Sequence, residues 1–129
     1  MPTISSLEHF ETSGEYGYFR PVGQVTLQEA IELVTRAITL ARERSIRRLF
    51  VNAAGLTGFP SPTLPERYFA AREWAGAAPP DLRFSLVVRA EMIDPEKFGA
   101  MVARNAGLDA NVFADEAEAL SWLGSDSRD

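Results

Sequence analysis

The chain has 129 residues, which is the length of one compact domain and leaves no room for a second core of ordinary size. Hydrophobic residues make up 46% and charged residues 24%, a balance typical of a folded globular protein that excludes disorder and collagen-like structure. The formal net charge of −5 disfavours nucleic acids and anionic membrane surfaces as partners. Because the chain has no cysteine and one histidine, disulfides, thiolate nucleophiles and Cys/His zinc sites are excluded.

The first residues lack the basic segment and long apolar core of a signal peptide. No stretch approaches the roughly 18 consecutive apolar residues of a membrane-spanning helix. We therefore expect a cytoplasmic protein that forms a single domain over residues 1–129.

The N-terminal part predicts a β-hairpin. Leu7–Thr12 and Tyr16–Val25 carry aromatic and aliphatic residues and are separated by Ser13-Gly14-Glu15, a connection suited to a hairpin. Pro21 has no N–H group to donate, so we expect the second strand to be irregular near its end.

A helix is predicted directly after the hairpin. Thr26 and Glu29 have the spacing of a capping box. Apolar residues then recur at steps of four, three, four and three, which indicates one buried helical face. These residues are Leu27, Ile31, Val34, Ile38 and Ala41. We expect the helix to end among arginines that interact favourably with the negative end of the helix dipole. The run comprises Arg42, Arg44, Arg47 and Arg48.

The middle of the chain predicts a strand, a helix and a second strand. Leu49-Phe50-Val51 is an apolar run that leads into the loop 52–55. A proline-rich connection follows, and a helix is expected from Leu64 to about Ala75 with Pro65 in its first turn. Residues 82–88 alternate between apolar and more polar positions, so we expect a strand and a sheet with one partly open face.

The C-terminal part predicts two more helices around a short strand. Asp94-Pro95-Glu96 provides a capping carboxylate, a proline and an early acid, which is typical of a helix start. The expected buried stripe of this helix, up to Gly107, is Phe98, Met101, Val102 and Ala106. A strand at 110–114, a helix at 115–123 and a frayed tail at 124–129 complete the chain. The order β-β-α-β-α-β-α-β-α predicts an α/β fold with a mixed, mainly parallel sheet.

This order of elements resembles the STAS or SpoIIAA-like family over roughly residues 7 to 123. Three segments carry the similarity. They are Arg48–Asn52 with Gly55-Leu56-Thr57-Gly58, Leu86-Val87-Val88 with Asp94–Gly99, and Val112-Phe113 with Asp115-Glu116 and Ala119–Leu123. The resemblance implies an N-terminal antiparallel hairpin, helices in β-α units and a role as a regulatory or protein-interaction module.

In anti-sigma-factor antagonists, this family implies a phosphorylatable hydroxyl at the start of the helix after the central strand. The matching hydroxyls here are Ser61 and Thr63. In those proteins the hydroxyl lies in a short Asp-Ser-Ser-Gly-like stretch. The preceding Asp and the following Gly are absent from this sequence. We favour the alternative that Ser61 is a turn residue and Thr63 an N-cap residue.

We expect the functional surface between Asn52 and Tyr68, because a long Gly/Pro-rich connection at the carboxyl end of a parallel strand is a common binding position in α/β proteins. The candidate partner-binding residues are Asn52, Phe59, Arg67 and Tyr68. The leading hypothesis is a non-enzymatic module that binds a protein partner there. The alternative is a domain that binds a small apolar ligand or lipid in a cavity on the less covered sheet face. An exposed edge strand also predicts a homodimer.

For the other candidate residues and motifs, we favour structural roles over functional ones. His9, beside Glu8 and Glu11, is expected to be a surface histidine, and no serine lies in a nucleophile-elbow sequence. Gly55–Gly58 lacks the lysine and the further glycine of a nucleotide-binding loop.

The acidic groups around Asp94 and Asp115 are expected to cap helices rather than to bind a metal. Trp74 and Trp122 are expected to be half-buried anchors. We therefore predict no enzymatic activity, no cofactor and no metal.

Overall fold

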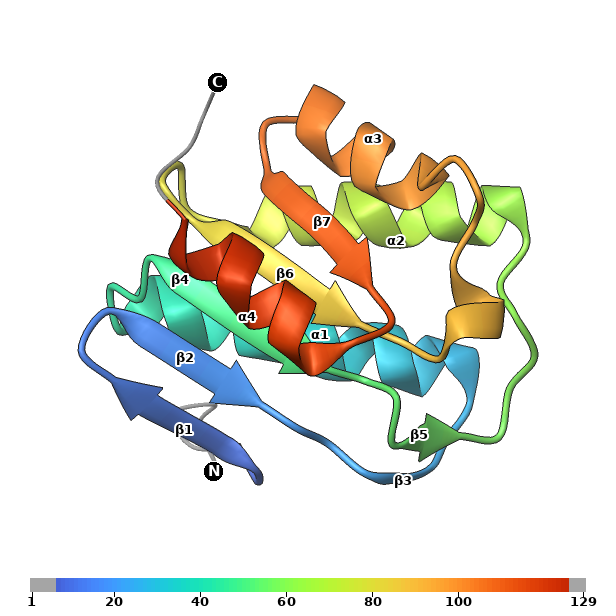
Figure 1. The fold of residues 1–129 in the computed structure, drawn as a ribbon, viewed down its shortest axis with the longest axis horizontal. Coiled ribbons are helices and arrows are strands. Elements are labelled where there is room, and N and C mark those ends of the chain that lie inside the picture. Colours follow the sequence, from blue (N-terminus) through green and yellow to red (C-terminus); the bar gives the residue numbers. More distant parts are fainter. Residues whose placement is uncertain (1–6, 126–129) are drawn as a thin grey trace.

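A five-stranded sheet forms the centre of the structure, a computed structural model that describes residues 7–125 (Figure 1). The strand order is β1-β2-β4-β6-β7. The pairing of β1 with β2 is antiparallel, and the remaining pairs are parallel. The strands are β1 (Phe10–Ser13), β2 (Tyr16–Phe19), β4 (Arg48–Asn52), β6 (Arg83–Val87) and β7 (Asp109–Phe113). The predicted α/β class with a mixed, mainly parallel sheet is confirmed.

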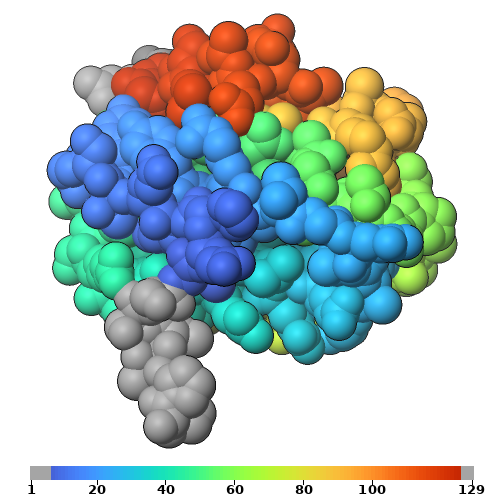
Figure 2. Space-filling model, turned by 90° about the horizontal axis from the view of Figure 1, so that it is seen from below, coloured from blue at the N-terminus to red at the C-terminus, as the bar shows by residue number. Residues whose placement is uncertain are grey.

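Four helices cover the sheet unequally. One face carries α1 (Leu27–Glu43), α2 (Leu64–Ala77) and α3 (Phe98–Asn105), which share one buried apolar cluster with the sheet. The opposite face carries α4 (Glu116–Gly124), which buries a smaller cluster around Phe50. Seen from the hairpin side, β1 and β2 (blue) lie between α4 (red) and α1 (cyan) (Figure 2). The domain therefore has three layers, with the larger core on the three-helix side.

The predicted second strand is shorter than expected. β2 ends at Phe19, before Pro21, and a separate strand β3 (Gly23–Gln24) follows. β3 pairs in parallel with β5 (Leu56–Thr57), a pair that the sequence analysis did not predict. Gly58 follows β5 with φ +107, and a Cβ there would lie 2.5 Å from the carbonyl oxygen of Val25. The small sheet therefore depends on a glycine at this position.

The predicted capping of α1 is confirmed. The Glu29 backbone N–H donates to Thr26 Oγ1 over 3.0 Å, and the Thr26 N–H donates to the Glu29 carboxylate over 2.9 Å. The same reciprocal pair begins α2, where Thr63 Oγ1 accepts from the Glu66 N–H over 3.3 Å. Each box satisfies two N–H groups that a helix start otherwise leaves unpaired.

The predicted start of α3 was wrong by three residues. Asp94 Oδ2 accepts hydrogen bonds from the backbone N–H groups of Glu96 and Phe98, at 3.1 and 3.0 Å. Lys97 has a left-handed backbone (φ 52), which separates this turn from the helix. The buried face of α3 also differs from the prediction. Met101 is 44% exposed, whereas Ala100, Val102 and Ala103 are buried. The acid and proline thus form a turn, preceded by a short 3₁₀ helix η1 (Ala90–Met92).

The C-terminal strand and helix lie within one residue of their predicted bounds. Asp115 caps α4 by accepting a hydrogen bond from the Glu118 N–H over 3.0 Å. Gly124 belongs to α4 rather than to a tail, and residues 126–129 lie outside the described part of the chain. Among residues 7–125, no helix is both long enough and apolar enough to cross a membrane.

Two arginines hold the end of α4 against the sheet. Arg83 Nη1 donates to the Ser125 carbonyl over 2.8 Å, and its guanidinium lies 3.9 Å from the centre of the Trp122 ring. Arg48 donates to the carbonyls of Leu123 and Ser125. Cations are favourable at the carbonyl end of a helix because the helix dipole is negative there. Arg48, which was predicted to lie at the end of α1, therefore belongs to β4 and interacts with the end of α4 instead, whereas Arg42 lies in the last turn of α1.

Candidate ligand-binding site

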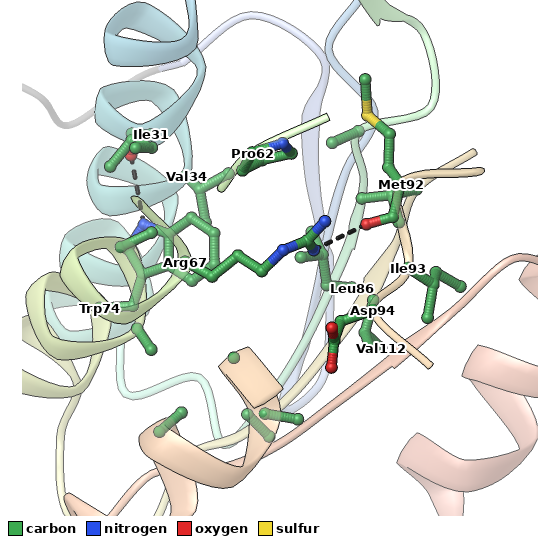
Figure 3. A pocket seen from close by; sticks show the side chains of 18 of the residues that line it. Ile31, Val34, Pro62, Arg67, Trp74, Leu86, Met92, Ile93, Asp94 and Val112 are labelled. Carbon is green, nitrogen blue, oxygen red and sulfur yellow. Dashed lines mark hydrogen bonds between the residues drawn. The ribbon is translucent and has the colours of Figure 1, made fainter. Parts of the chain in front are cut away.

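A partly enclosed cavity of about 150 Å³ lies between the sheet and the helices α1, α2 and α3 (Figure 3). Its walls are mainly apolar and come from segments far apart in the sequence. They include Ile31, Val34, Trp74, Phe84, Leu86 and Val112. Leu86 and Val112 lie late in β6 and β7, so the cavity extends to the carboxyl ends of these parallel strands, where α/β folds commonly bind ligands.

Small side chains are the physical reason for the empty space. Alanines occur in each of the three helices and in the sheet where these elements face the cavity. They include Ala30, Ala70, Ala71, Ala100, Ala103 and Ala110. Alanine side chains are too short to fill the space between the helices and the sheet. The helix backbones do not approach closely enough to close this space. The cavity is therefore encoded in the side-chain sizes on these packed faces.

Trp74 forms part of the wall with its polar atom satisfied. Its Nε1–H group donates to the Ile31 carbonyl over 3.3 Å, which joins α2 to α1. Its ring meets Phe84 edge to face, with the ring centres 5.8 Å apart. This geometry is favourable for aromatic pairs and leaves aromatic surface to line the cavity. The expectation of a half-buried Trp74 agrees with its intermediate exposure.

Arg67 is one of four charged residues in the cavity wall, together with Glu66, Asp94 and Lys97. It extends from α2, and its Nη1 donates to the Met92 carbonyl over 2.8 Å (Figure 3). The side chain is half-buried. In the part of the chain that the structure describes, no carboxylate forms an ion pair with it. The guanidinium therefore keeps donors beyond the one that Met92 uses.

Lys97 is a second cation in the cavity wall. Its Nζ donates to Asn111 Oδ1 over 3.1 Å and lies 4.9 Å from the centre of the Phe113 ring. Burial lowers the pKa of this amine, and the nearby Arg104 lowers it further, while Glu118 acts in the opposite direction. Sequence reasoning did not single out Lys97 or Asn111, because only the turn at Asp94 brings Lys97 towards β7.

The four predicted partner-binding residues do not form one surface. Both polar atoms of the Asn52 side chain form hydrogen bonds within the protein. Its Nδ2 donates to Glu116 Oε2 over 2.7 Å, and its Oδ1 accepts from the Ala54 N–H. Phe59 and Arg67 line the cavity. Tyr68 is 49% exposed on α2, on the outer surface. The predicted region therefore contributes to the cavity and to the surface of α2.

The two predicted phosphorylation candidates have structural contacts. Ser61 Oγ donates to the Glu91 carbonyl over 3.1 Å, and Thr63 is the N-cap of α2. The N-cap role expected for Thr63 is confirmed, whereas Ser61 lies outside a turn and bonds to a residue 30 positions away. His9 is exposed in the turn before β1, with φ 68, and does not line the cavity.

A charged cluster joins β4 to the start of α4 on the other sheet face. Arg20 and Glu116 form a paired contact, with Nε and Oε2 2.9 Å apart and Nη2 and Oε1 3.4 Å apart. The hydrogen bond from Arg20 lowers the pKa of Glu116, the bond from Asn52 lowers it further, and burial opposes both. The same ion pair raises the pKa of Arg20.

The depressed pKa of Glu116 predicts an acid-dependent contribution to stability. The contribution is fully present above the ordinary glutamate pKa of about 4.3 and is lost as the pH falls through the lower folded-state pKa. Glu116→Gln should therefore reduce the free energy of unfolding at neutral pH by up to about 1 kcal/mol, since the pair is partly exposed. Urea denaturation at several pH values measures this difference.

Glu118→Gln, at an exposed position in the same helical turn, is the control for the helix-dipole effect. The difference between the Glu116→Gln variant and the wild type should shrink below about pH 4. A difference that stayed constant down to pH 2 would contradict a role for the charge.

No protein-family model matches this sequence, and a search of curated proteins gives no match. Within residues 7–125, no group of three or more His, Cys, Asp or Glu residues is arranged to hold a metal ion. The mainly apolar cavity, with its two cations and two acids, is the candidate site in the described part of the chain.

Proposed function

We propose that this chain is a non-enzymatic binding domain of the SpoIIAA-like type that holds a small apolar molecule in the cavity. The observation that carries the proposal is a volume of about 150 Å³ bounded mainly by aliphatic and aromatic side chains between three helices and the sheet. Of the two functions that the sequence suggested, this geometry favours ligand binding. The cavity lies on the three-helix face, however, and not on the less covered face where a cavity was expected.

The size of the cavity limits the ligand. In another protein, an engineered apolar cavity of about 150 Å³ stays dry and binds benzene. Each methylene group buried in such a space contributes about 0.8 kcal/mol. An aromatic ring or a short branched chain therefore fits the volume, whereas a long lipid chain exceeds it.

Filling the cavity tests the proposal. Ala100 lies on α3, is buried and lines the cavity. Ala100→Leu should abolish binding of toluene, because the leucine side chain occupies the ligand's space. Binding is measured by fluorescence of Trp74, which lines the cavity, in a Trp122→Phe background that removes the signal from the other sheet face.

Ala106→Leu is the matched control, since Ala106 follows α3 at an exposed position outside the cavity. This variant should bind toluene like the wild type. Equal binding by the Ala100→Leu variant, with its fold intact by circular dichroism, would show that toluene binds elsewhere.

A protein partner is the second candidate function, and a different observation favours it. Large apolar side chains on α2 and α3 are exposed, at 51% for Leu64, 50% for Phe69 and 44% for Met101. Tyr68 adds an aromatic ring next to Phe69, with the Arg72 guanidinium 6.0 Å from its centre. Exposed aromatic residues are enriched at protein interfaces.

The simplest partner is a second copy of the chain. Sedimentation equilibrium at high protein concentration should show a dimer, and the double change Tyr68→Ser with Phe69→Ser should shift it towards monomer because apolar contact area is lost. A wild-type monomer at high concentration would contradict self-association.

A further inference from the structure

We infer that the ligand of the cavity is a small carboxylate whose anionic group binds the Arg67 guanidinium while its apolar body fills the cavity. The inference rests on the proposed function and adds the chemical class of the ligand. It starts from an unusual juxtaposition, a half-buried cation among apolar side chains with one backbone carbonyl as its hydrogen-bond partner.

Arg67 has more hydrogen-bond donors than its contacts within the protein use. A guanidinium carries five N–H donors in a planar fork, and here Nη1 is bonded to the Met92 carbonyl. Among the described residues, the Met92 carbonyl is the one acceptor bonded to this side chain. A partly buried cation is costly unless acceptors satisfy it. A carboxylate suits this group because it can accept two parallel hydrogen bonds from the fork.

The two acids in the cavity wall, Asp94 and Glu66, bond to backbone groups of their own segments. Asp94 Oδ2 accepts from the backbone N–H groups of Glu96 and Phe98, and the Glu66 carboxylate accepts from the Thr63 N–H over 2.8 Å. Both carboxylates are thus held by the turns and caps of their own segments. Neither forms an ion pair with Arg67 among the described residues. The remaining donors of Arg67 are therefore not used by either of these acids.

The rest of the cavity is mainly apolar and includes the Trp74 ring. In the view of Figure 3, Trp74 and the guanidinium lie at opposite ends of the Arg67 side chain. The wall carries two cations, Arg67 and Lys97, and two acids, Glu66 and Asp94, so the binding of an anion depends on the local donors of Arg67. A ligand with an apolar ring near Trp74 and an anionic group at Arg67 matches the apolar wall and the remaining donors of this guanidinium. Small aromatic carboxylates, with benzoate as the simplest, have this form.

Calorimetric titration with three probes of similar size tests the inference. Benzoate is anionic, benzyl alcohol neutral and benzylamine cationic at neutral pH. The wild-type chain should bind benzoate at least about tenfold more tightly than benzyl alcohol, because a hydrogen bond to a charged group contributes that much. Benzylamine should bind most weakly, and added salt should weaken the binding of benzoate only.

Two arginine variants locate the effect. Arg67→Gln should reduce the affinity for benzoate to that for benzyl alcohol, whereas Arg72→Gln, an exposed arginine of the same helix, should leave both affinities unchanged. Equal wild-type affinity for benzoate and benzyl alcohol would overturn the carboxylate inference and leave the apolar site standing. A preference for benzoate that survives in Arg67→Gln would also overturn it. Failure of toluene and all three probes to bind would remove the proposed function itself.

Discussion

Replacement of Phe84 by alanine is expected to lower the free energy of unfolding by about 3 to 5 kcal/mol, as is typical when a buried phenylalanine is truncated. Phe84 lies on β6, is 2% exposed, and packs edge to face against Trp74. The loss is a large part of the roughly 5 to 15 kcal/mol that stabilises a domain of ordinary size. Urea denaturation followed by far-UV circular dichroism measures it.

The same change should alter ligand selection, because Phe84 is part of the cavity wall. A larger cavity should admit naphthalene, and a saturating ligand should restore part of the lost stability by mass action. Phe113→Ala is the control, since Phe113 is only half-buried and packs against Trp122 in the other apolar cluster. If both variants gained naphthalene binding equally, Phe84 would not be part of the ligand site.

Replacement of Arg83 by methionine is expected to cost about 2 to 4 kcal/mol, the sum of a cation–π contact and a charged hydrogen bond. The side chain is 12% exposed, and its Nε lies 3.6 Å from Asp109 Oδ2. The loss should weaken the docking of α4, because Arg83 joins Trp122 and the Ser125 carbonyl to the sheet. Chemical denaturation measures the cost, and hydrogen exchange of the α4 amides locates it.

Arg47→Met serves as the control for the loss of a positive charge at the same end of the sheet. The Arg47–Asp81 pair spans 3.5 Å, and its side chains are 58% and 77% exposed, so little stability should be lost. Equal losses in the two variants would mean that the contact of Arg83 with α4 contributes nothing specific.

The parts of the fold that follow from local chemistry were predictable. Thr26 and Glu29 fix the start of α1 through hydrogen bonds three residues apart, and the periodic apolar residues identify its buried face. Asp94 shows the limit of this reasoning. A carboxylate followed by proline is compatible with a helix start and with a turn, and the left-handed backbone at Lys97 decides for the turn. The two-residue strands β3 and β5 are too short to show a periodic pattern.

The candidate site was predictable only in part. Arg67 and Phe59 belong to the segment where a function was expected, and both reach the cavity. The sequence could not show that Met92 would accept a hydrogen bond from Arg67, because 25 residues separate the two and the contact depends on tertiary packing. The cavity itself depends on which alanines face each other across α1, α2 and α3. Such pairing has no signature in a single sequence.

The alanine-lined space between the helices has a further consequence for how the chain responds to hydrostatic pressure. Unfolding eliminates internal voids, so compression favours the unfolded chain in proportion to the empty volume inside the native one. A ligand that occupies the space removes part of this volume difference. The empty form should therefore be the more easily unfolded by pressure, and the occupied form the more resistant.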